Sequence, residues 1–378
     1  MKYEFPKNFY WGAATSAHQV EGNNFNDWSR WEKEKCIEES GMACDHYNHF
    51  REDFDIAQEL GHNAHRFSIE WSRIETEEGK FEVESLRHYE HVVKALRERN
   101  IEPFVTLWHW TLPRWLADKG GIENNKFPEY FARYVEHVAK WFDDTDAGVT
   151  FWMIFNEPGY WFGNAFWTKK FPAPKTGIIP AVKTYRNLIS AHKAAYAVLK
   201  KNNPACMVGV VEATGWIAPE PIRLIFHELR NFVFPRLVKG YFDFFGLNYY
   251  RRAHIFGRKI GDTSEIGWEI YPEGLYKLLK DAYRRFKKPI IITENGIADS
   301  TDAKRGKFIS DHLAQVHGAI GDGVDIRGYL YWSLMDNFEW DSGFGPRFGL
   351  VEVNYETLER KIRPSAYEYA KIAKNNGF

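Results

Sequence analysis

The stretch Thr150-Phe-Trp-Met-Ile-Phe-Asn156-Glu157-Pro158 is apolar until it ends on an amide, a carboxylate and a proline. The stretch Pro289-Ile-Ile-Ile-Thr-Glu294-Asn295-Gly296 has the same design, an apolar run that leads to a carboxylate. Runs that are apolar throughout, rather than alternating, are typical of strands buried on both faces of a sheet. Each stretch therefore predicts a buried parallel strand that presents a glutamate at its C-terminal end, followed by turn residues.

Six further strand-like runs are spaced along the chain, with helix-like stretches between them. The expected strands are 9–15, 64–69, 103–109, 150–156, 207–213, 242–249, 289–293 and 326–333. Apolar residues recur at helical spacing in 86–96, 127–142, 181–199, 272–286 and 308–320. Eight strands that alternate with helices predict an α/β fold with parallel strands, and favour a closed (β/α)8 TIM barrel. A doubly wound open sheet is the alternative, but Gly12-Ala-Ala-Thr-Ser16 lacks the glycine spacing that is usual in its first turn.

The length and composition fit one barrel. The chain has 378 residues, of which 44% are hydrophobic, so it can bury a large core. It contains no linker, no low-complexity segment and no long block of like charge. We therefore expect residues 1–378 to form a single (β/α)8 barrel domain.

Charge and cysteine content restrict the partners and the location. The formal net charge of −1 gives no indication of a nucleic acid or an anionic membrane surface as partner. No signal-like N-terminal segment and no run long enough to span a bilayer occur, which favours a cytoplasmic protein. Cys36, Cys44 and Cys206 form no C-x-x-C pair and are expected to be free thiols, with a disulfide or a metal site as the alternative.

Polar and aromatic side chains gather at the ends of the expected strands. In a barrel these ends meet around one mouth, where barrel enzymes hold their active sites. The residues concerned are Gln19, Arg66, His109, Asn156, Glu157, Asn248, Tyr250, Glu294, Trp332, Glu339 and Trp340. Amides and carboxylates bind hydroxyl groups and indoles cover apolar ring faces, so the mixture suits a neutral polyhydroxyl ligand. No lysine is placed for a Schiff base and no cluster has metal-ligand spacing, so we expect neither a cofactor nor a metal.

Each of these residues has a structural explanation when it is taken alone. Arg66 would serve as a buried ion-pair partner, His109 as a hydrogen-bonded core histidine, and Trp332 and Trp340 as filling for the top of the barrel. The high aromatic content, 17% with fifteen tryptophans, fits core filling as well as a platform for sugar rings. Their joint occurrence at the ends of seven strands favours a functional site.

Six ordered motifs make the chain resemble glycoside hydrolase family 1, the β-glucosidase and β-galactosidase family, from Phe9 to about Tyr369. They are Phe9-Tyr-Trp-Gly-Ala-Ala-Thr-Ser-Ala-His-Gln-Val-Glu-Gly22, His65-Arg-Phe-Ser-Ile-Glu-Trp-Ser-Arg-Ile74, Asn156-Glu-Pro158, Asp243-Phe-Phe-Gly-Leu-Asn-Tyr-Tyr250, Ile292-Thr-Glu-Asn-Gly296 and Tyr331-Trp-Ser-Leu-Met-Asp-Asn-Phe-Glu-Trp340. The resemblance implies a retaining, exo-acting β-glycosidase that hydrolyses β-glucosides, β-galactosides or β-fucosides. Its partner would be a small glycoside or an oligosaccharide.

The resemblance also implies roles for the two glutamates. Glu157 matches the family's acid/base and Glu294 its nucleophile, and retaining enzymes hold the two carboxyl groups about 5–5.5 Å apart. Arg66, Asn248 and Tyr250 match positions that support the nucleophile, and they would favour its ionised form. The charge of Glu294 would in turn help to keep Glu157 protonated.

The remaining matches imply a sugar-binding cradle. Gln19 and Glu339 match residues that bind hydroxyls remote from the reacting carbon, and Asn156 matches the contact to the 2-hydroxyl. The other matching positions are His109 and Trp340 as hydroxyl donors, Trp332 as the floor under the ring, Trp268 as a wall of the leaving-group site, and Phe348 beside the cradle.

The chain also departs from the family pattern, mostly on the leaving-group side. Family members have long excursions before the sixth strand, whereas only a short segment separates Ala213 from Asp243 here. Gly159 stands where the family commonly has Trp, and Thr111 where Asp is usual. We therefore expect an intact sugar cradle, a reduced barrel rim around strands five and six, and weak discrimination between leaving groups.

Three other functions are open to a chain of this family. A 6-phospho-β-glycosidase is disfavoured because Glu339, Pro346 and Phe348 occupy the phosphate-binding positions, and a carboxylate repels a phosphate. A thioglucosidase would carry Gln in place of Glu157. A weakly active or mainly sugar-binding member is the third alternative, which the reduced rim keeps open although both glutamates are present.

Overall fold

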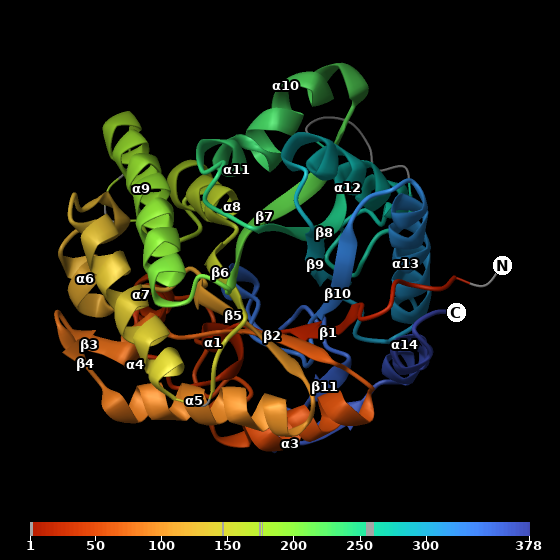
Figure 1. Cartoon of the computed structure of the whole chain (residues 1–378), viewed down its shortest axis with the longest axis horizontal. Helices are drawn as coiled ribbons and strands as arrows, with labels where there is room; N and C mark the ends of the chain where they lie inside the picture. Colours follow the sequence, from red (N-terminus) through yellow and green to blue (C-terminus); the bar gives the residue numbers. More distant parts are fainter. Residues whose placement is uncertain (1–2, 146, 174, 176, 255–260) are drawn as a thin grey trace.

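The computed structural model describes residues 3–145, 147–173, 175, 177–254 and 261–378, and its centre is a closed parallel barrel (Figure 1). The barrel order is β1-β10-β9-β8-β7-β6-β5-β2. Its strands are β1 (Tyr10–Ala14), β2 (Ala64–Ser68), β5 (Glu102–Trp108), β6 (Phe151–Asn156), β7 (Met207–Ala218), β8 (Phe244–His254), β9 (Ile290–Asn295) and β10 (Ile326–Trp332). The predicted TIM barrel is confirmed, with all eight strands, and the open-sheet alternative is wrong because β1 pairs with β10 along its whole length.

A helix follows every barrel strand and covers the outside of the barrel (Figure 1). These helices are α3 (His46–Glu59), α5 (Val83–Glu98), α7 (Phe127–Asp144), α9 (Ile178–Asn202), α10 (Glu220–Asn231) with α11 (Val233–Leu237), α12 (Pro272–Phe286), α13 (Arg305–Gly321) and α14 (Pro364–Asn375). The five helices expected from the sequence are confirmed. The structure adds α10 and α11 between β7 and β8, in the segment that the sequence left without an element.

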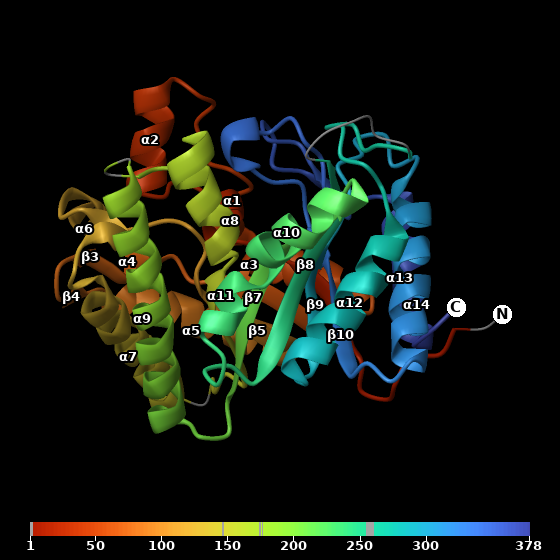
Figure 2. The ribbon, with the colours of Figure 1, turned by 90° about the horizontal axis from the view of Figure 1, so that it is seen from above.

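Short elements decorate the barrel, mostly around its C-terminal end. They are α1 (Ala17–Val20), α2 (Asp27–Lys35), α4 (Trp71–Ile74), α6 (Arg114–Asp118), α8 (Pro158–Gly163), two 3-10 turns (Gly121–Glu123 and Trp340–Ser342), a π-helical turn (Asn164–Thr168) and the hairpins β3 (Glu75–Glu77) with β4 (Lys80–Phe81) and β11 (Val351–Val353) with β12 (Arg360–Ile362). In Figure 2, α2, α8 and the segment after β10 stand together at one end of the barrel. That end therefore carries most of the loops.

The lumen of the barrel is filled by a cluster of apolar side chains. It consists of Ala64, Phe104, Phe151, Met153, Val211, Phe244, Ile291 and Leu330, with Tyr10 and Met207 packed against it, so every strand contributes. Phe104 stacks on Phe151 with ring centres 4.3 Å apart. Because strand side chains alternate, Arg66, Thr106 and Thr293 each lie two residues beyond a member of this cluster, and Asn248 lies four residues beyond Phe244. An apolar floor thus supports a polar layer at the C-terminal end.

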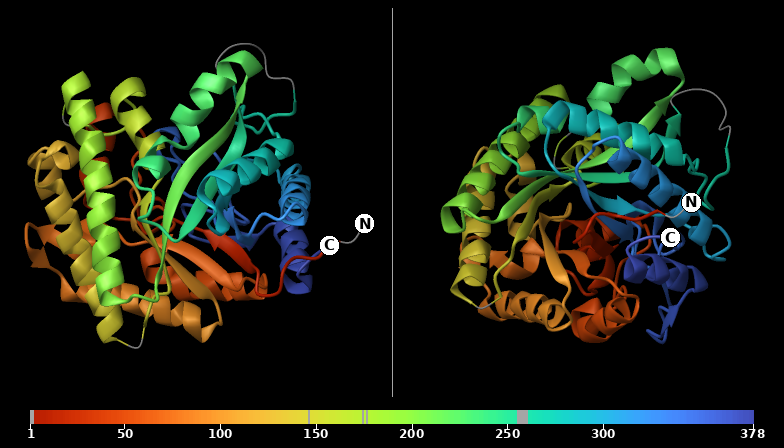
Figure 3. Two further views of the ribbon diagram at one scale, coloured as in Figure 1. Left: turned by 45° about the horizontal axis from the view of Figure 1, so that its top comes forward. Right: turned by 45° about the vertical axis from the view of Figure 1, so that its right-hand side comes forward.

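The strands β7 and β8 run further than the sequence predicted. We expected 207–213, whereas β7 continues to Ala218, and β8 continues beside it to His254. The pair projects from the barrel, and α10 lies along it in Figure 3. The reduced rim is therefore a two-stranded extension backed by one helix.

Barrel closure brings the two ends of the chain together, as Figure 1 shows. Besides the β1–β10 pairing, the backbone N of Tyr3 donates to the carbonyl of Phe378 at 2.6 Å, and the backbone N of Phe378 donates back at 3.0 Å. Among the described helices, none has the length and apolarity needed to cross a bilayer. Cys36, Cys44 and Cys206 are free thiols, as expected.

Candidate active site

The C-terminal ends of the barrel strands surround a cavity of about 120 Å³. Eleven of the thirteen predicted site residues line it: Gln19, His109, Asn156, Glu157, Tyr250, Trp268, Glu294, Trp332, Glu339, Trp340 and Phe348. The other two, Arg66 and Asn248, are buried beneath the cavity and bond to residues that line it. The structure therefore brings the whole predicted set together.

Glu294 is held by two donors at the end of β9. The guanidinium of Arg66 donates from Nη1 to its Oε1 at 2.5 Å, and the hydroxyl of Tyr250 donates to its Oε2 at 2.5 Å. Burial raises the pKa of Glu294, whereas the charge of Arg66 and these hydrogen bonds lower it. Because both oxygens accept bonds that favour the anion, Glu294 is the carboxyl of the site that ionises first.

Glu157 is in a different environment directly after β6. It has a left-handed backbone with φ of 46°, which turns the chain sharply into α8. Its Oε1 accepts one hydrogen bond from Nδ2 of Asn248 at 2.7 Å. Burial raises the pKa of Glu157 to about 8, and the neighbouring charge of Glu294 contributes to the rise. The two carboxyl groups thus differ in their surroundings: Glu294 accepts from a guanidinium and a phenol, whereas Glu157 accepts from a neutral amide.

Left-handed backbone recurs around this cavity. Trp110 has φ of 80° and Trp340 has φ of 55°, and both line the cavity with Glu157. Large residues adopt this conformation at a cost of about 1–3 kcal/mol each, and such residues cluster at functional sites. The surrounding fold therefore holds three side chains of the cavity in conformations that an isolated chain would avoid.

Asn156 connects the carboxyl groups to His109. Its Oδ1 accepts from Nη2 of Arg66 at 2.7 Å and from Nδ2 of Asn248 at 3.2 Å. Its Nδ2 must then be the donor to Nε2 of His109, at 3.0 Å. Burial lowers the pKa of His109 well below its ordinary value, so the ring is neutral and carries its proton on Nδ1. Among the described residues, that buried Nδ1 has no hydrogen-bond partner, so its N–H is an unused donor.

Gln19 and Glu339 form a second polar group across the cavity. Nε2 of Gln19 donates to Oδ1 of Asn337 at 2.9 Å and to the carbonyl of Phe338 at 2.8 Å. Both amide hydrogens of Gln19 are then used, and its Oε1 accepts from the hydroxyl of Ser16 at 2.6 Å. Nε1 of Trp332 donates to Oε1 of Glu339 at 3.0 Å, and burial raises the pKa of Glu339 to about 8.

Aromatic rings make the walls of the cavity. Trp332 lies almost parallel to the imidazole of His109, with ring centres 6.1 Å apart. Trp268 meets Tyr250 at 5.6 Å and Phe348 at 6.0 Å. Polar groups therefore line part of the cavity and ring faces line the rest, as binding of a polyhydroxyl ligand requires.

Several residues that line the cavity were not predicted from the sequence. Those with large or charged side chains are Trp110, Tyr160, Phe171, Arg230, Arg251, Ile266 and Asp341. Trp110 and Tyr160 lie next to predicted residues in the chain, which was a usable signal. Arg230 comes from α10, which the sequence analysis did not expect, and no local pattern indicated it.

The chemistry open to this site follows from its donors and acceptors. It contains the carboxyl groups of Glu157, Glu294 and Glu339, neutral amides, a neutral imidazole and indoles. Among the described residues, no group of three or more histidines, cysteines or carboxylates is placed to hold a metal ion. Acid, base and nucleophilic chemistry on an uncharged, hydroxyl-bearing ligand is what these groups can perform.

Comparison with known proteins agrees with this chemistry. The sequence model of Glycosyl hydrolase family 1 matches residues 1–223 and 256–378. β-Glucosidase A of Acetivibrio thermocellus is 34% identical, and the alignment covers 100% of both chains. That alignment extends over 454 positions against 378 residues here, so the relative contains segments that this chain lacks. A β-galactosidase of Sulfolobus acidocaldarius is 30% identical over 99% of this chain and 96% of the relative.

Solved structures show the same architecture. A β-glycosidase from Pyrococcus horikoshii superposes with a TM-score of 0.93 at 37% identity, covering 100% of this chain and 96% of the other. A β-glucosidase from Thermotoga maritima, in complex with glucoimidazole, superposes with a TM-score of 0.93 at 32% identity and covers 100% of both chains. The chain described here therefore belongs to glycosyl hydrolase family 1 and is a glycoside hydrolase of the β-glycosidase type.

Proposed function

We propose that this enzyme is a retaining, exo-acting β-glycosidase that hydrolyses β-glucosides, and also accepts β-galactosides or β-fucosides. The observation that carries the proposal is the difference between the two carboxyl groups. Glu294 accepts bonds from a guanidinium and a phenol, whereas Glu157 accepts one from a neutral amide and has a pKa raised to about 8. Double displacement needs this pairing of an ionised nucleophile with a protonated acid.

In the first step, Glu294 attacks the anomeric carbon while Glu157 donates its proton to the departing oxygen. The bond between that carbon and the leaving group breaks, and an ester to Glu294 forms. Esterification removes the charge of Glu294, which is one of the influences that keep the pKa of Glu157 high. Glu157 then accepts a proton from water, which attacks the ester and releases the sugar with its original configuration.

The remaining polar groups bind the sugar. Nδ1–H of His109, which has no hydrogen-bond partner among the described residues, donates to a hydroxyl, and Oε1 of Gln19 accepts from another hydroxyl through the lone pair that Ser16 does not use. Glu339 completes the cradle, with Trp332 beneath the sugar ring. Asn156 holds the 2-hydroxyl, where the guanidinium of Arg66 polarises its amide oxygen. A contact to the 2-hydroxyl strengthens as positive charge develops at the neighbouring carbon.

An unphosphorylated sugar fits this cradle better than a 6-phosphosugar. Glu339 lies on the cavity wall, and Pro346 and Phe348 line the same cavity without offering a positive charge. A phosphate would then face a carboxylate without a compensating cation from these positions. The proposed substrates are therefore plain glycosides.

The test is a panel of aryl and disaccharide β-glycosides, with the anomer of the first-formed sugar followed by NMR. We expect the β-anomer first, and loss of turnover in Glu294→Ala. Glu352→Ala, which removes an exposed carboxylate from β11, is the matched control and should keep activity. First appearance of the α-anomer would mean single displacement. Sugar binding without turnover by the wild-type enzyme would instead indicate a binding protein.

A further inference from the structure

Two arginines line the side of the cavity from which the leaving group departs. Arg230 lines the cavity together with Glu157 and Tyr160. Arg251 lies with its Cζ 4.6 Å above the ring of Trp268. Both line the cavity, and both fall in residues 224–255, between the two parts of the chain that the family model matches.

A β-bulge directs Arg251 into the cavity. Thr214 of β7 pairs with Tyr249 of β8, and Trp216 pairs with Arg252, so Gly215 alone faces both Tyr250 and Arg251. The extra residue breaks the alternation of side chains along β8. As a result, Tyr250 and Arg251 both line the cavity, although they are consecutive in the strand.

Helix α10 brings Arg230 to the same place. Asn231 is buried and bonds Gly215 twice: its Oδ1 accepts from the backbone N at 3.0 Å and its Nδ2 donates to the carbonyl at 3.2 Å. A Cβ at Gly215 would lie 3.0 Å from Nε of Arg230, so glycine makes room for the guanidinium. The end of α10 is thus fixed to β7 with Arg230 facing inward.

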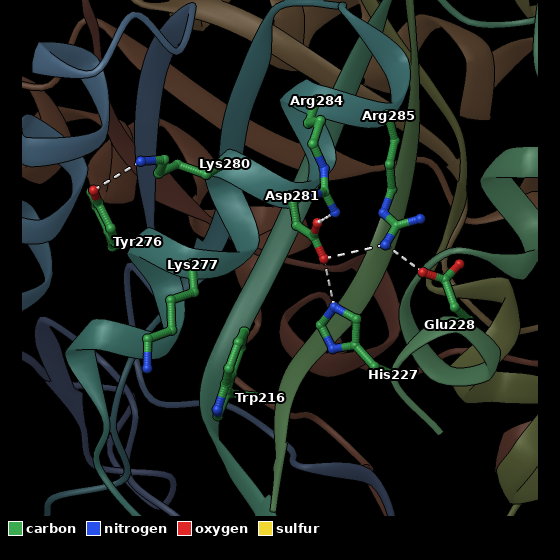
Figure 4. A pocket seen from close by; sticks show the side chains of 9 residues that line it. All are labelled: Trp216, His227, Glu228, Tyr276, Lys277, Lys280, Asp281, Arg284 and Arg285. Carbon is green, nitrogen blue, oxygen red and sulfur yellow. Dashed lines mark hydrogen bonds and ion pairs between the residues drawn. The ribbon is translucent and has the colours of Figure 1, made fainter. Parts of the chain in front are cut away.

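Neither guanidinium pairs with a carboxylate in the part of the chain that the structure describes. Among the described residues, Arg230 and Arg251 form no ion pair within 4.0 Å, and Nε of Arg230 is buried without a hydrogen bond. The outer cavity between α10 and α12 offers a contrast (Figure 4): Arg284 pairs with Asp281, and Arg285 pairs with Asp281 and Glu228. Arg284 and Arg285 are thus paired with carboxylates in the outer cavity, whereas Arg230 and Arg251 form no ion pair with a described residue.

Leaving two unpaired guanidiniums half-buried and close together is unfavourable without an anion. Burial lowers the pKa of Arg230 and of Arg251, and repulsion from Arg230 adds to the lowering at Arg251. Glu212 lies nearby on β7, but burial raises the pKa of this carboxyl well above its ordinary value. Among the described residues, Glu212 forms no ion pair within 4.0 Å with Arg230 or Arg251.

We infer that Arg230 and Arg251 form an anion-binding subsite, and that the enzyme acts on β-glycosides whose aglycone carries a carboxylate. This inference rests on the proposed glycosidase function and specifies its leaving group. Two guanidiniums bind a carboxylate through charge-assisted hydrogen bonds, and Trp268 provides a ring face for the body of the aglycone. This inference makes the expected weak discrimination between leaving groups more specific. The shape of the aglycone should have little effect on kcat/KM, whereas its charge should have a large effect.

The test compares 4-(carboxymethyl)phenyl and 4-(carbamoylmethyl)phenyl β-glucosides. A methylene insulates each phenol from the substituent, so the two leaving groups have similar reactivity and differ mainly in charge. We expect kcat/KM to favour the carboxylate by about tenfold or more in the wild type, the effect of a charged hydrogen bond. The preference should fall towards one in Arg230→Gln and in Arg251→Gln, and should weaken with added salt.

The preference is a ratio within each variant, so a general loss of folded enzyme cancels. Arg236→Gln is the control, because this arginine of α11 is 56% exposed in its side chain and pairs with Glu228 at 3.1 Å. It should keep the wild-type ratio. If the wild type turns over the neutral substrate but shows a kcat/KM ratio near one, the proposed anion-binding subsite is wrong, whereas the proposed glycosidase function still stands. Failure to turn over either substrate overturns the glycosidase itself. If the arginine variants shift the pH profile of kcat/KM but keep the ratio between the two substrates, the arginines act by changing the ionisation of Glu157, and the inference is wrong.

Discussion

The pKa of Glu157 predicts how the reaction depends on pH and on the leaving group. With a pKa of about 8, about 90% of Glu157 carries its proton at pH 7 and about 10% at pH 9. A poor leaving group such as phenol needs that proton, so kcat/KM for phenyl β-glucoside should fall about tenfold between these pH values. A good leaving group such as 2,4-dinitrophenol departs without help, and its kcat/KM should fall much less.

Glu339 must be separated from this effect, because its pKa is also raised to about 8. Glu339 is proposed to bind the sugar, which both substrates share, so its ionisation should change both profiles alike. Only the difference between the two profiles reports Glu157.

The assay is kcat/KM for both glucosides from pH 6 to 10, in the wild type and in Glu157→Ala. The difference between the profiles should disappear in the variant, where any common change remains. Equal falls for both substrates in the wild type would refute Glu157 as the acid.

Three further outcomes follow from the site. In Glu157→Ala, substrates with good leaving groups should still esterify Glu294 and then stall for want of a base; azide, which needs no base, should restore turnover as β-glycosyl azide, detectable by mass spectrometry. Glu339→Ser removes acceptors for the sugar hydroxyls and should cost about 1.5–3 kcal/mol in kcat/KM for each charged bond lost; an unchanged rate on plain glucosides would show that the cradle is elsewhere. Asn231→Ala leaves both backbone groups of Gly215 without their side-chain partner and should destabilise the rim by about 1–3 kcal/mol. Hydrogen exchange at the amide of Gly215 should then become faster, whereas exchange in the barrel floor should not change.

The barrel and the two glutamates were predictable because they depend on local patterns. Buried parallel strands must be apolar on both faces, so runs such as 150–156 and 289–293 are visible without any knowledge of their neighbours. A glutamate at the end of such a run stands out because charge is rare there. The polar cradle followed because each of its residues stands directly after a strand, and closure of the barrel brings those ends together.

The rim could not be predicted, because its geometry depends on contacts between distant parts of the chain. Arg230 faces the cavity because Asn231 bonds Gly215, sixteen residues earlier in the chain. Alternation from Tyr250 would turn Arg251 outward, and only the pairing of β8 with Gly215 reveals the bulge. The segment that forms α10 and α11 also contains Pro219, Pro221 and Pro235, and it is divided into two short helices.

Pairing of β1 with β10 affects how the enzyme folds during its synthesis on the ribosome. The first barrel strand is synthesised more than three hundred residues before β10. The edge of β1 that pairs with β10 therefore stays unpaired through almost the whole of translation. Gln19 follows β1, whereas Asn337 and Phe338, which hold its amide, follow β10. The sugar cradle is therefore completed only when β10 pairs with β1, the last step in closing the barrel. A chain stalled before β10 would contain the nucleophile but could not hold a sugar next to it.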